Sequence, residues 1–368
     1  MTLQDVMAAH SRRLLPMLAN TSAISLRRIA MKAIARYCLV CFSFLLFATL
    51  PLAAQVGWSQ YEIPGKDEGT PAITVALYYP SPSKTRDIPM GPFMIHAAIK
   101  GGAEPTVKGL ILLSHGLGAS ELAHSRLAEA LATRGYLVAA LRHPGDNYMD
   151  GSLLKKTPER YFFERPRQVT RVIDALMADP NWKDRIARDG KGPRIGALGH
   201  SAGGYTVLAL AGGVPDLAQS NRHCQEEGGE DPLYCKTGGS SWRPDAPPQA
   251  GLPLKDARVR AVVAMAPVGV LFTAESLAKV QVPIAIYAGV KDRWLVPRFH
   301  AMWIAKNVSG AELHMVPNAW HFAFSDTPSF PIPTPDGDMA ADPAGFDRAA
   351  FLKTMGTDIA DFFDKTLK

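Results

Sequence analysis

The residues best suited to chemistry in this chain are Gly199-His200-Ser201-Ala202-Gly203, a Gly-x-Ser-x-Gly pattern. An apolar run over 195–198 precedes them, and a helix-like run over 205–211 follows. A serine hydroxyl is a weak nucleophile at neutral pH and must be held in the open beside a base. A sharp strand-to-helix turn exposes it, and glycines leave room for that turn. The pattern therefore predicts that Ser201 is a nucleophile, against the alternative of a chance match in a glycine-rich chain.

A carboxylate and a histidine follow in the chain order that such a nucleophile requires, acid before base. A buried-strand run over 282–288 ends near Asp292, and another over 311–316 leads to His321. We expect both at the carboxyl ends of strands, where open α/β sheets place their sites. In this assignment His321 takes the Ser201 proton, and Asp292 fixes the histidine tautomer and stabilises the imidazolium. A lone aspartate or histidine is more often structural, but the shared position and the order favour a triad.

A glycine-rich segment, Ser114 to Ser120, follows a predicted strand over 109–113. A tetrahedral intermediate needs two N–H groups aimed at its oxyanion. We expect one from Ala202, directly after the nucleophile, and one from Leu117 in this loop. His115 precedes the nucleophile, so we interpret it as loop scaffolding and not as the base. The alternative is an ordinary strand-to-helix turn.

These motifs together resemble the α/β-hydrolase superfamily. More narrowly, they are similar to bacterial proteins described as predicted dienelactone hydrolases and to platelet-activating-factor acetylhydrolases. The residues that carry the resemblance are His115-Gly116-Leu117-Gly118-Ala119, Gly199-His200-Ser201-Ala202-Gly203-Gly204, Asp292 with Val296-Pro297, and Ala319-Trp320-His321-Phe322, and it spans roughly 58–366. True dienelactone hydrolases carry a cysteine where this chain has Ser201, so that label says little about the substrate.

Apolar strand-like runs alternate with helix-like runs along most of the chain. This alternation predicts an α/β fold with a mostly parallel central sheet and helices on both faces, as the resemblance implies. Strands over 58–63 and 73–79 should open the fold as an antiparallel pair. A helix capped by Ser120 should end near Arg134, and apolar residues at helical spacing predict a closing helix over 351–363.

Several stretches show no clear periodicity. We expect loop over 81–107, an irregular segment over 142–164 that overhangs the site, and a Pro-rich connection over 325–346. The largest is an insertion over 212–257, after the nucleophile helix. A stretch this long between strands is usually functional or disordered. It suits a lid or pocket wall, or a surface excursion pinned by a disulfide.

The net charge belongs mainly to the beginning of the chain. The 368 residues carry a formal +6, with 47% hydrophobic residues, enough for a large core. Residues 1–54 have six Arg or Lys against one Asp, which leaves +1 for the remainder. No basic patch then remains to indicate a nucleic-acid partner. We therefore expect one catalytic domain over 55–368.

Residues 1–54 are typical of a secretory leader. Lys32 and Arg36 precede an apolar stretch over 37–50, and small residues over 51–54 offer a cleavage site. Met31 would begin a leader of ordinary length, so it is a possible true start. The apolar stretch is short for a membrane span. An uncleaved anchor helix is the alternative, and Sec and twin-arginine export both stay open. We expect a periplasmic or secreted protein without a stable anchor.

Cysteine usage agrees with export. Removal of the leader leaves Cys224 and Cys235, an even count suited to an oxidising compartment. They suit one local disulfide. A metal site including the neighbouring His223 is a rival, but no further pair of ligands has suitable spacing. We expect no metal and no cofactor.

The leading hypothesis is an exported serine esterase that forms an acyl-enzyme and takes uncharged esters of short to medium acyl chain. A serine peptidase of the same fold and a non-catalytic binding module are the alternatives. Aromatic residues flank the predicted acid and base and favour an apolar pocket, although they could instead support the loops from below; they are Trp294, Trp320, Phe322 and Phe324. The oligomeric state stays open.

Overall fold

A sheet of ten strands organises the computed structural model, which describes residues 55–67, 69–156, 158–236 and 254–368. The predicted leader and the possible start at Met31 lie outside the described residues. In spatial order the strands are β12 (Glu312–Val316), β11 (Ile284–Gly289), β10 (Val259–Met265), β9 (Ile195–His200), β5 (Leu110–Ser114), β6 (Leu137–Leu141), β2 (Ile73–Ser81), β1 (Gln55–Ile63), β4 (Phe93–Ile99) and β3 (Arg86–Met90).

The part of the sheet from β6 to β12 is parallel throughout. Ser114 at the end of β5 is level with Gly199 on β9, which in turn is level with Ala264 on β10. The carboxyl ends of these strands therefore meet at one edge, where the predicted catalytic loops begin. Beyond β6 the pairing changes, because β2 runs antiparallel to both β6 and β1, as expected for the opening pair.

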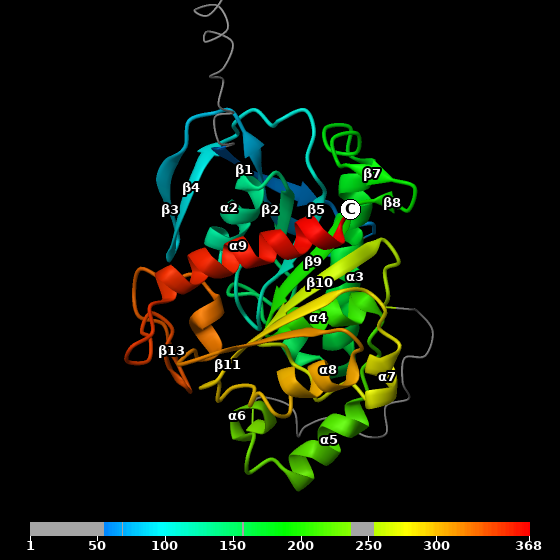
Figure 1. Cartoon of the computed structure of the whole chain (residues 1–368), viewed down its shortest axis with the longest axis vertical. Helices are drawn as coiled ribbons and strands as arrows, with labels where there is room; N and C mark the ends of the chain where they lie inside the picture. The colour runs from blue at the N-terminus through cyan, green and yellow to red at the C-terminus, as the bar shows by residue number, and fades with distance from the viewer. Residues whose placement is uncertain (1–54, 68, 157, 237–253) are drawn as a thin grey trace, which may run out of the picture. The chain divides into compact units, whose positions relative to one another are not determined.

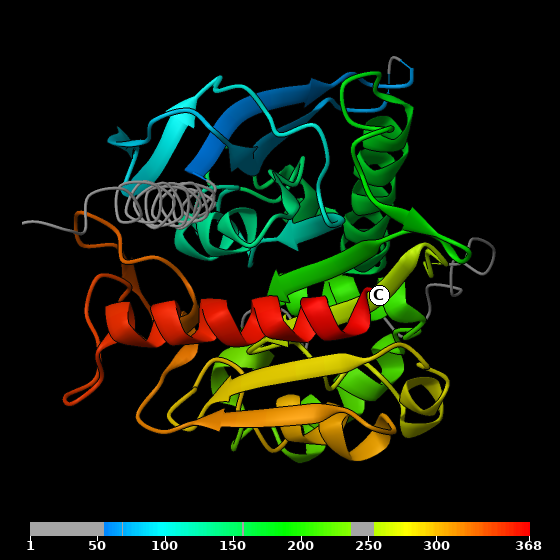
Figure 2. The same ribbon diagram turned by 45° about the horizontal axis from the view of Figure 1, so that its top comes forward.

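Helices cover both faces of the sheet (Figures 1 and 2). They are α2 (Ser125–Thr133), α3 (Pro158–Ala178), α4 (Ala202–Ala211), α5 (Leu217–Glu226), α6 (Pro232–Tyr234), α7 (Ala274–Ala278), α8 (Ala301–Asn307) and α9 (Arg348–Thr366), with short 3-10 turns η1 (Ser152–Lys155) and η3 (His321–Phe324). Two small hairpins complete the fold: β7 (Arg188–Asp189) with β8 (Gly192–Pro193), and β13 (Pro333–Thr334) with β14 (Gly337–Asp338).

The two faces bury separate apolar clusters. Successive side chains of a strand point to opposite faces, and β5 follows this rule: Leu110 and Leu112 pack with α3, α4 and α8, whereas Ile111 and Leu113 pack with α2 and α9. Every residue of β5 is buried. The continuous apolar runs that predicted buried parallel strands are explained by this two-sided covering.

Several expected loops contain regular structure. The stretch 81–107 holds the antiparallel pair β3–β4, in which Phe93, Ile95 and Ala97 point inward; its Pro, Gly and Lys content concealed this alternation. The predicted irregular segment 142–164 includes η1 and the start of α3. The Pro-rich connection 325–346 contains the hairpin β13–β14.

Two further boundaries differ from expectation. The helix predicted to start at Ser120 begins at Ser125, and the Ser120 hydroxyl instead accepts the N–H of Leu122 in a preceding turn, 3.0 Å away. The described part of the 212–257 insertion holds α5 and α6; residues 237–253 lie outside it. No helix of the described residues has both the length and the apolarity to cross a bilayer.

Candidate active site

Ser201 occupies a strained turn between β9 and α4. Its backbone has φ 57° and ψ −116°, a conformation that costs a non-glycine residue free energy and persists only where its surroundings enforce it. The surroundings here are hydrogen bonds on both sides of the peptide. The Ser201 N–H donates to Met265 O at 2.9 Å, and its carbonyl accepts from Val268 N at 3.2 Å. The turn holds the serine partly exposed at the carboxyl edge of the sheet.

The glycines of the motif are required by close packing. A Cβ on Gly199 would overlap the carbonyl of Gly203, and a Cβ on Gly203 would overlap the carbonyl of Ser114 at the end of β5. The strand, the turn and the helix can therefore approach only because both positions lack a side chain. This agrees with the role predicted for these glycines.

Asp292 and His321 meet at the same edge, after β11 and β12. The Nδ1 atom of His321 lies 2.8 Å from Asp292 Oδ2, and both side chains are buried. The second carboxylate oxygen, Oδ1, accepts the backbone N–H groups of Trp294 and Leu295, each at 2.9 Å. Asp292 is thus fixed on both oxygens, so Nδ1 carries the hydrogen and Nε2 is left as the basic nitrogen.

A second histidine connects the base to the nucleophile turn. His200, the residue before Ser201, donates Nε2–H to the carbonyl of His321 at 2.9 Å. The imidazole rings of His200 and His321 are 4.9 Å apart between centroids. The structure therefore places the three predicted triad residues at one edge of the sheet, with His200 joining the loop of His321 to the turn of Ser201.

The loop after β5 lies against the nucleophile. A Cβ on Gly116 would come 3.3 Å from the Cβ of Ser201, and Ala119 N donates to Gly116 O at 3.2 Å, closing a turn around Leu117. Ala202 is the first residue of α4, so its N–H has no acceptor within the helix. The two N–H groups predicted to bind an oxyanion, those of Leu117 and Ala202, thus lie on segments that flank Ser201.

Two buried histidines beside the site, His115 and His200, are held in the neutral form. Burial, followed by the charge of nearby Arg165, lowers the pKa of His115 to about 4. Burial, followed by the charge of His321, lowers the pKa of His200 well below its ordinary value. His115 Nδ1–H donates to Gly116 O, and its Nε2 accepts the N–H of His143 at 3.1 Å. His115 is therefore scaffolding for the loop, as expected from its place before the nucleophile.

Two buried charged residues near this loop form an ion pair that the sequence did not predict. Asp146, after β6, accepts the N–H of Gly118 at 2.8 Å, and it forms an ion pair with Arg165 of α3; both side chains are fully buried. The spacing within α3 explains the pair. Arg165 lies four residues before the buried Val169 and so on the apolar face of the helix, where an arginine needs a buried partner.

The aromatic residues flanking the acid and base divide into two groups. Trp294 stacks on His321, with ring centroids 5.9 Å apart and planes at 29°. Trp320 and Phe324 are buried, and Phe324 belongs to the apolar cluster beneath α2 and α9. Support from below is thus the role of Phe324, whereas Trp294 lies directly on the imidazole.

The insertion is anchored to the loop that follows Asp292. The insertion contains the predicted Cys224–Cys235 disulfide, whose Cα atoms are 5.5 Å apart. Buried Asp231 lies 3.0 Å from His223 Nε2 and 2.8 Å from His300 Nε2. These bonds occupy the residues of the rival metal site. Among the described residues, no group of three or more His, Cys, Asp or Glu is placed to hold a metal ion.

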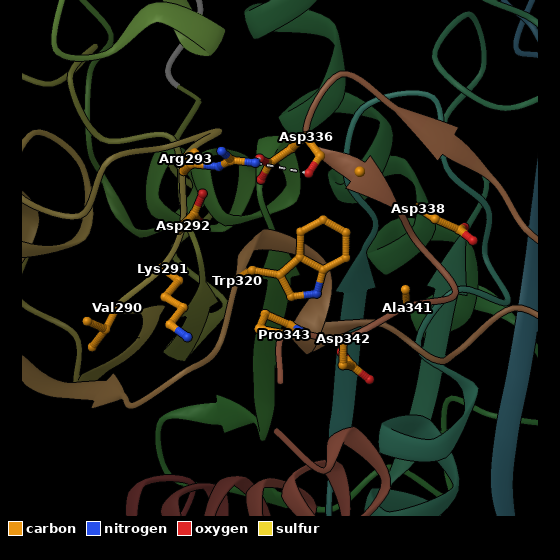
Figure 3. Close-up of a pocket in the computed structure, with 11 residues that line it drawn as sticks. Val290, Lys291, Asp292, Arg293, Trp320, Asp336, Asp338, Ala341, Asp342 and Pro343 are labelled. Carbon is orange, nitrogen blue, oxygen red and sulfur yellow. Dashed lines mark hydrogen bonds and ion pairs between the residues drawn. The ribbon is translucent and has the colours of Figure 1, made fainter. Parts of the chain in front are cut away.

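A cavity of about 550 Å³ adjoins the acid (Figure 3). It is lined by Val290, Lys291, Asp292, Arg293, Trp320, Asp336, Gly337, Asp338, Ala341, Asp342 and Pro343. Of the candidate triad, Asp292 alone belongs to this lining. Two other lining residues are bonded to each other, with Arg293 Nε 2.6 Å from Asp336 Oδ1. The cavity therefore lies beside the acid and not in front of the serine.

Comparisons with known proteins bear on the fold and on the class of enzyme. A family model described as serine aminopeptidase, S33, matches residues 105–222, a range that includes the loop after β5 and Ser201 but ends before Asp292. No curated protein matches the chain. Solved structures do match the chain, and two of them are described next.

A ferulic acid esterase from Streptomyces cinnamoneus superposes with a TM-score of 0.58 and 21% identity, covering 87% of this chain and 92% of that chain. A dienelactone hydrolase from Anabaena variabilis has a TM-score of 0.47 and 14% identity, covering 84% of this chain and 99% of that one. The first likeness bears on the fold alone. The chain therefore has the α/β-hydrolase fold and resembles that superfamily, and the family match with Ser201 at its nucleophile turn supports a serine hydrolase.

Proposed function

We propose that the protein is an exported serine carboxylic-ester hydrolase that acts on uncharged esters of short to medium acyl chain. One observation carries the proposal: a buried Asp292–His321 pair, joined at 2.8 Å, stands at the sheet edge where Ser201 is held in a strained turn. This is the arrangement that converts a serine hydroxyl into a nucleophile.

The reaction has two halves with the same acid–base logic. His321 Nε2 takes the hydroxyl proton while Ser201 Oγ bonds to the ester carbonyl carbon. The tetrahedral intermediate collapses, the C–O bond to the alcohol breaks, and His321 returns the proton to the leaving oxygen. Water then attacks the acyl-enzyme, again losing its proton to His321, and the acid departs as Ser201 regains its hydrogen. Asp292 keeps Nδ1 protonated and stabilises the imidazolium throughout.

The negative charge of each tetrahedral intermediate needs fixed donors. The N–H groups of Ala202 and Leu117 are the candidates, because the first is free of a helical acceptor and the second belongs to the turn packed on Ser201. Such donors act most strongly when they are aimed before reaction begins, since no reorganisation is then needed.

Exposed apolar side chains beside the oxyanion loop support an uncharged substrate. Leu117 is 42% exposed, Tyr148 63% and Met149 70%. The last two follow β6 and are tied to the loop, because Tyr148 N donates to Ala119 O at 3.1 Å. Apolar groups grouped beside a site are suited to contact an acyl or aryl chain.

Export is part of the proposal and rests on the sequence. The basic, apolar and small-residue segments of the leader support cleavage near Gln55, and the disulfide suits an oxidising compartment. Intact mass of the processed protein tests this. A chain that begins near Gln55 is expected, and an exported protein that retains the leader would favour the anchor helix instead.

A serine peptidase is the second candidate, because the matching family is described as serine aminopeptidase, S33. The triad chemistry would be the same, so the substrate must decide. We expect purified protein to cleave p-nitrophenyl acetate and butyrate faster than amino-acid and peptide p-nitroanilides. Good turnover of anilides with inert acetyl and butyryl esters would favour the peptidase.

A further inference from the structure

Arg165 lies at the centre of a buried network that joins the oxyanion loop to the nucleophile helix. Its side chain and that of Asp146 are both fully buried. Removing one member of a buried ion pair leaves the other charge uncompensated, so such a pair holds its geometry firmly. The network reaches the loop by two routes.

The first route is direct. Arg165 Nη2 donates to the carbonyl of His115 and, at 3.2 Å, to the hydroxyl of Ser114. The Ser114 hydroxyl donates in turn to His143 Nε2 at 2.8 Å. The backbone on the N-terminal side of Leu117 is thereby fixed two residues before the predicted oxyanion donor.

The second route passes through the carboxylate. Arg165 Nη1 pairs with Asp146 Oδ2, which also accepts the hydroxyl of Tyr161 at 2.8 Å. The other oxygen, Oδ1, accepts the N–H of Gly118 at 2.8 Å. Gly118 follows Leu117 directly, so the network grips the loop on both sides of the Leu117 peptide.

A third contact reaches the nucleophile helix. Arg165 Nε donates to Thr206 Oγ1 at 3.1 Å, and the Thr206 hydroxyl donates to the carbonyl of Ala202 at 2.8 Å. One guanidinium thus contacts the segments that carry both predicted oxyanion donors. A planar fork with several fixed N–H groups can make these bonds at once, whereas a lysine ammonium cannot.

We propose that Arg165 is a positioning residue that sets the distance between the Leu117 and Ala202 N–H groups and so tunes the oxyanion site. This inference rests on the proposed function. It assigns Arg165 no contact with the substrate; it acts through the backbone of the loop and of α4. The predicted consequence is loss of transition-state binding with little change in ground-state binding.

The test is Arg165→Lys, which keeps the charge and removes the fork. Active sites are first counted with a fluorophosphonate that labels Ser201, and kcat and KM for p-nitrophenyl butyrate are then measured per labelled site. We expect kcat to fall roughly 10- to 100-fold, the range for displaced catalytic groups, with KM changed less than about threefold. Loss confined to transition-state stabilisation has this signature.

A tetrahedral inhibitor gives an independent readout. A trifluoromethyl ketone adds Ser201 Oγ to its carbonyl carbon, passes the serine proton to His321, and leaves an oxyanion on the former carbonyl oxygen. Its inhibition constant should weaken by about the same factor as kcat. The pH midpoint of kcat/KM should stay where it is, because the base is untouched.

Arg348→Lys is the matched control. Arg348 is also a buried arginine that clamps a loop, donating to Met339 O and Ala341 O at 2.9 Å each, but it contacts neither oxyanion segment. We expect the Arg348→Lys variant to be less stable than wild type, while its kcat per labelled site stays within twofold of the wild-type value. If Arg165→Lys fails to fold, Asp146→Asn, which is isosteric and keeps an acceptor for Gly118, replaces it and should show the same loss of kcat at constant KM.

The outcomes distinguish failure of the proposed function from failure of the positioning role alone. Wild-type protein that neither hydrolyses the ester nor takes up the fluorophosphonate would contradict the proposed function. Active wild type with Arg165→Lys, or Asp146→Asn in its place, at wild-type kcat per labelled site and unchanged inhibitor affinity would overturn the positioning role alone. A variant whose kcat drops only in proportion to its folded fraction would do the same.

Discussion

Asp292 is bonded to His321 through one carboxylate oxygen while backbone N–H groups hold the other, so the acid cannot turn away from the base. Asp292→Asn should keep the packing but can place an amide N–H against Nδ1, which favours the wrong tautomer. We expect kcat to fall by roughly 10⁴-fold with little change in KM. Steady-state kinetics on p-nitrophenyl butyrate measures this. Near-wild-type kcat would mean that another carboxylate orients His321.

Ser201→Ala removes the predicted nucleophile and should lower kcat by roughly 10⁶-fold. Residual hydrolysis above the water rate can persist from the oxyanion donors and substrate binding. The variant should also lose covalent labelling by a fluorophosphonate while its circular dichroism spectrum stays unchanged. Labelling that survives the substitution would assign the nucleophile to another residue.

The expected ends of the strands were enough to select three residues that the structure places at one edge of the sheet. The apolar runs that became β9 and β11 are fully buried, so they are readable without tertiary information, and Ser201 and Asp292 follow them. The strand before His321, β12, lies at the edge of the sheet and is only partly buried, with Leu313, Met315 and Val316 half-buried. The chain order of the three residues supplied the rest. Local sequence was enough here because each residue is placed by its own strand.

Features that depend on distant partners were missed. The helix α2 begins at Ser125 and not near Ser120, because Asp326, 200 residues along the chain, accepts the N–H of Arg126 at 3.0 Å. The Arg165–Asp146 pair likewise joins two segments that only the fold brings together. No local pattern encodes such partners, whereas helix caps within one segment are readable.

The Cys224–Cys235 disulfide should stabilise the insertion against unfolding. The two cysteines are 11 residues apart, so the disulfide closes a short loop. The lost entropy of the unfolded chain then corresponds to a stabilisation of about 2–3 kcal/mol. The double variant Cys224→Ser with Cys235→Ser should lower the free energy of unfolding in urea by that amount, without abolishing activity. Wild type treated with reductant is the matched sample. No difference between oxidised and reduced protein would show that the bond adds nothing to stability.

Gly203 should tolerate no side chain. A Cβ there would overlap the carbonyl of Ser114, so the nucleophile helix or β5 must shift. We expect Gly203→Ala to lower the melting temperature by more than 5 °C, corresponding to about 2 kcal/mol or more for a domain of this size, and to reduce kcat because Ser201 moves with the helix. Gly190→Ala is the control, since a Cβ there meets nothing within 4 Å. Equal effects of the two substitutions would contradict the packing argument.

Asp326 should make stability depend on pH. Burial raises its pKa to about 8; the Arg126 N–H opposes this shift and the buried Glu129 adds to it. An unfolded aspartate titrates near 3.9, so the folded state binds the extra proton between these values. The stabilisation is complete below about pH 4 and is lost as the pH rises through about 8. The melting temperature of Asp326→Asn minus that of wild type should therefore increase as the pH is raised from 5 to 9. A difference between the two proteins that does not change with pH would refute the raised pKa.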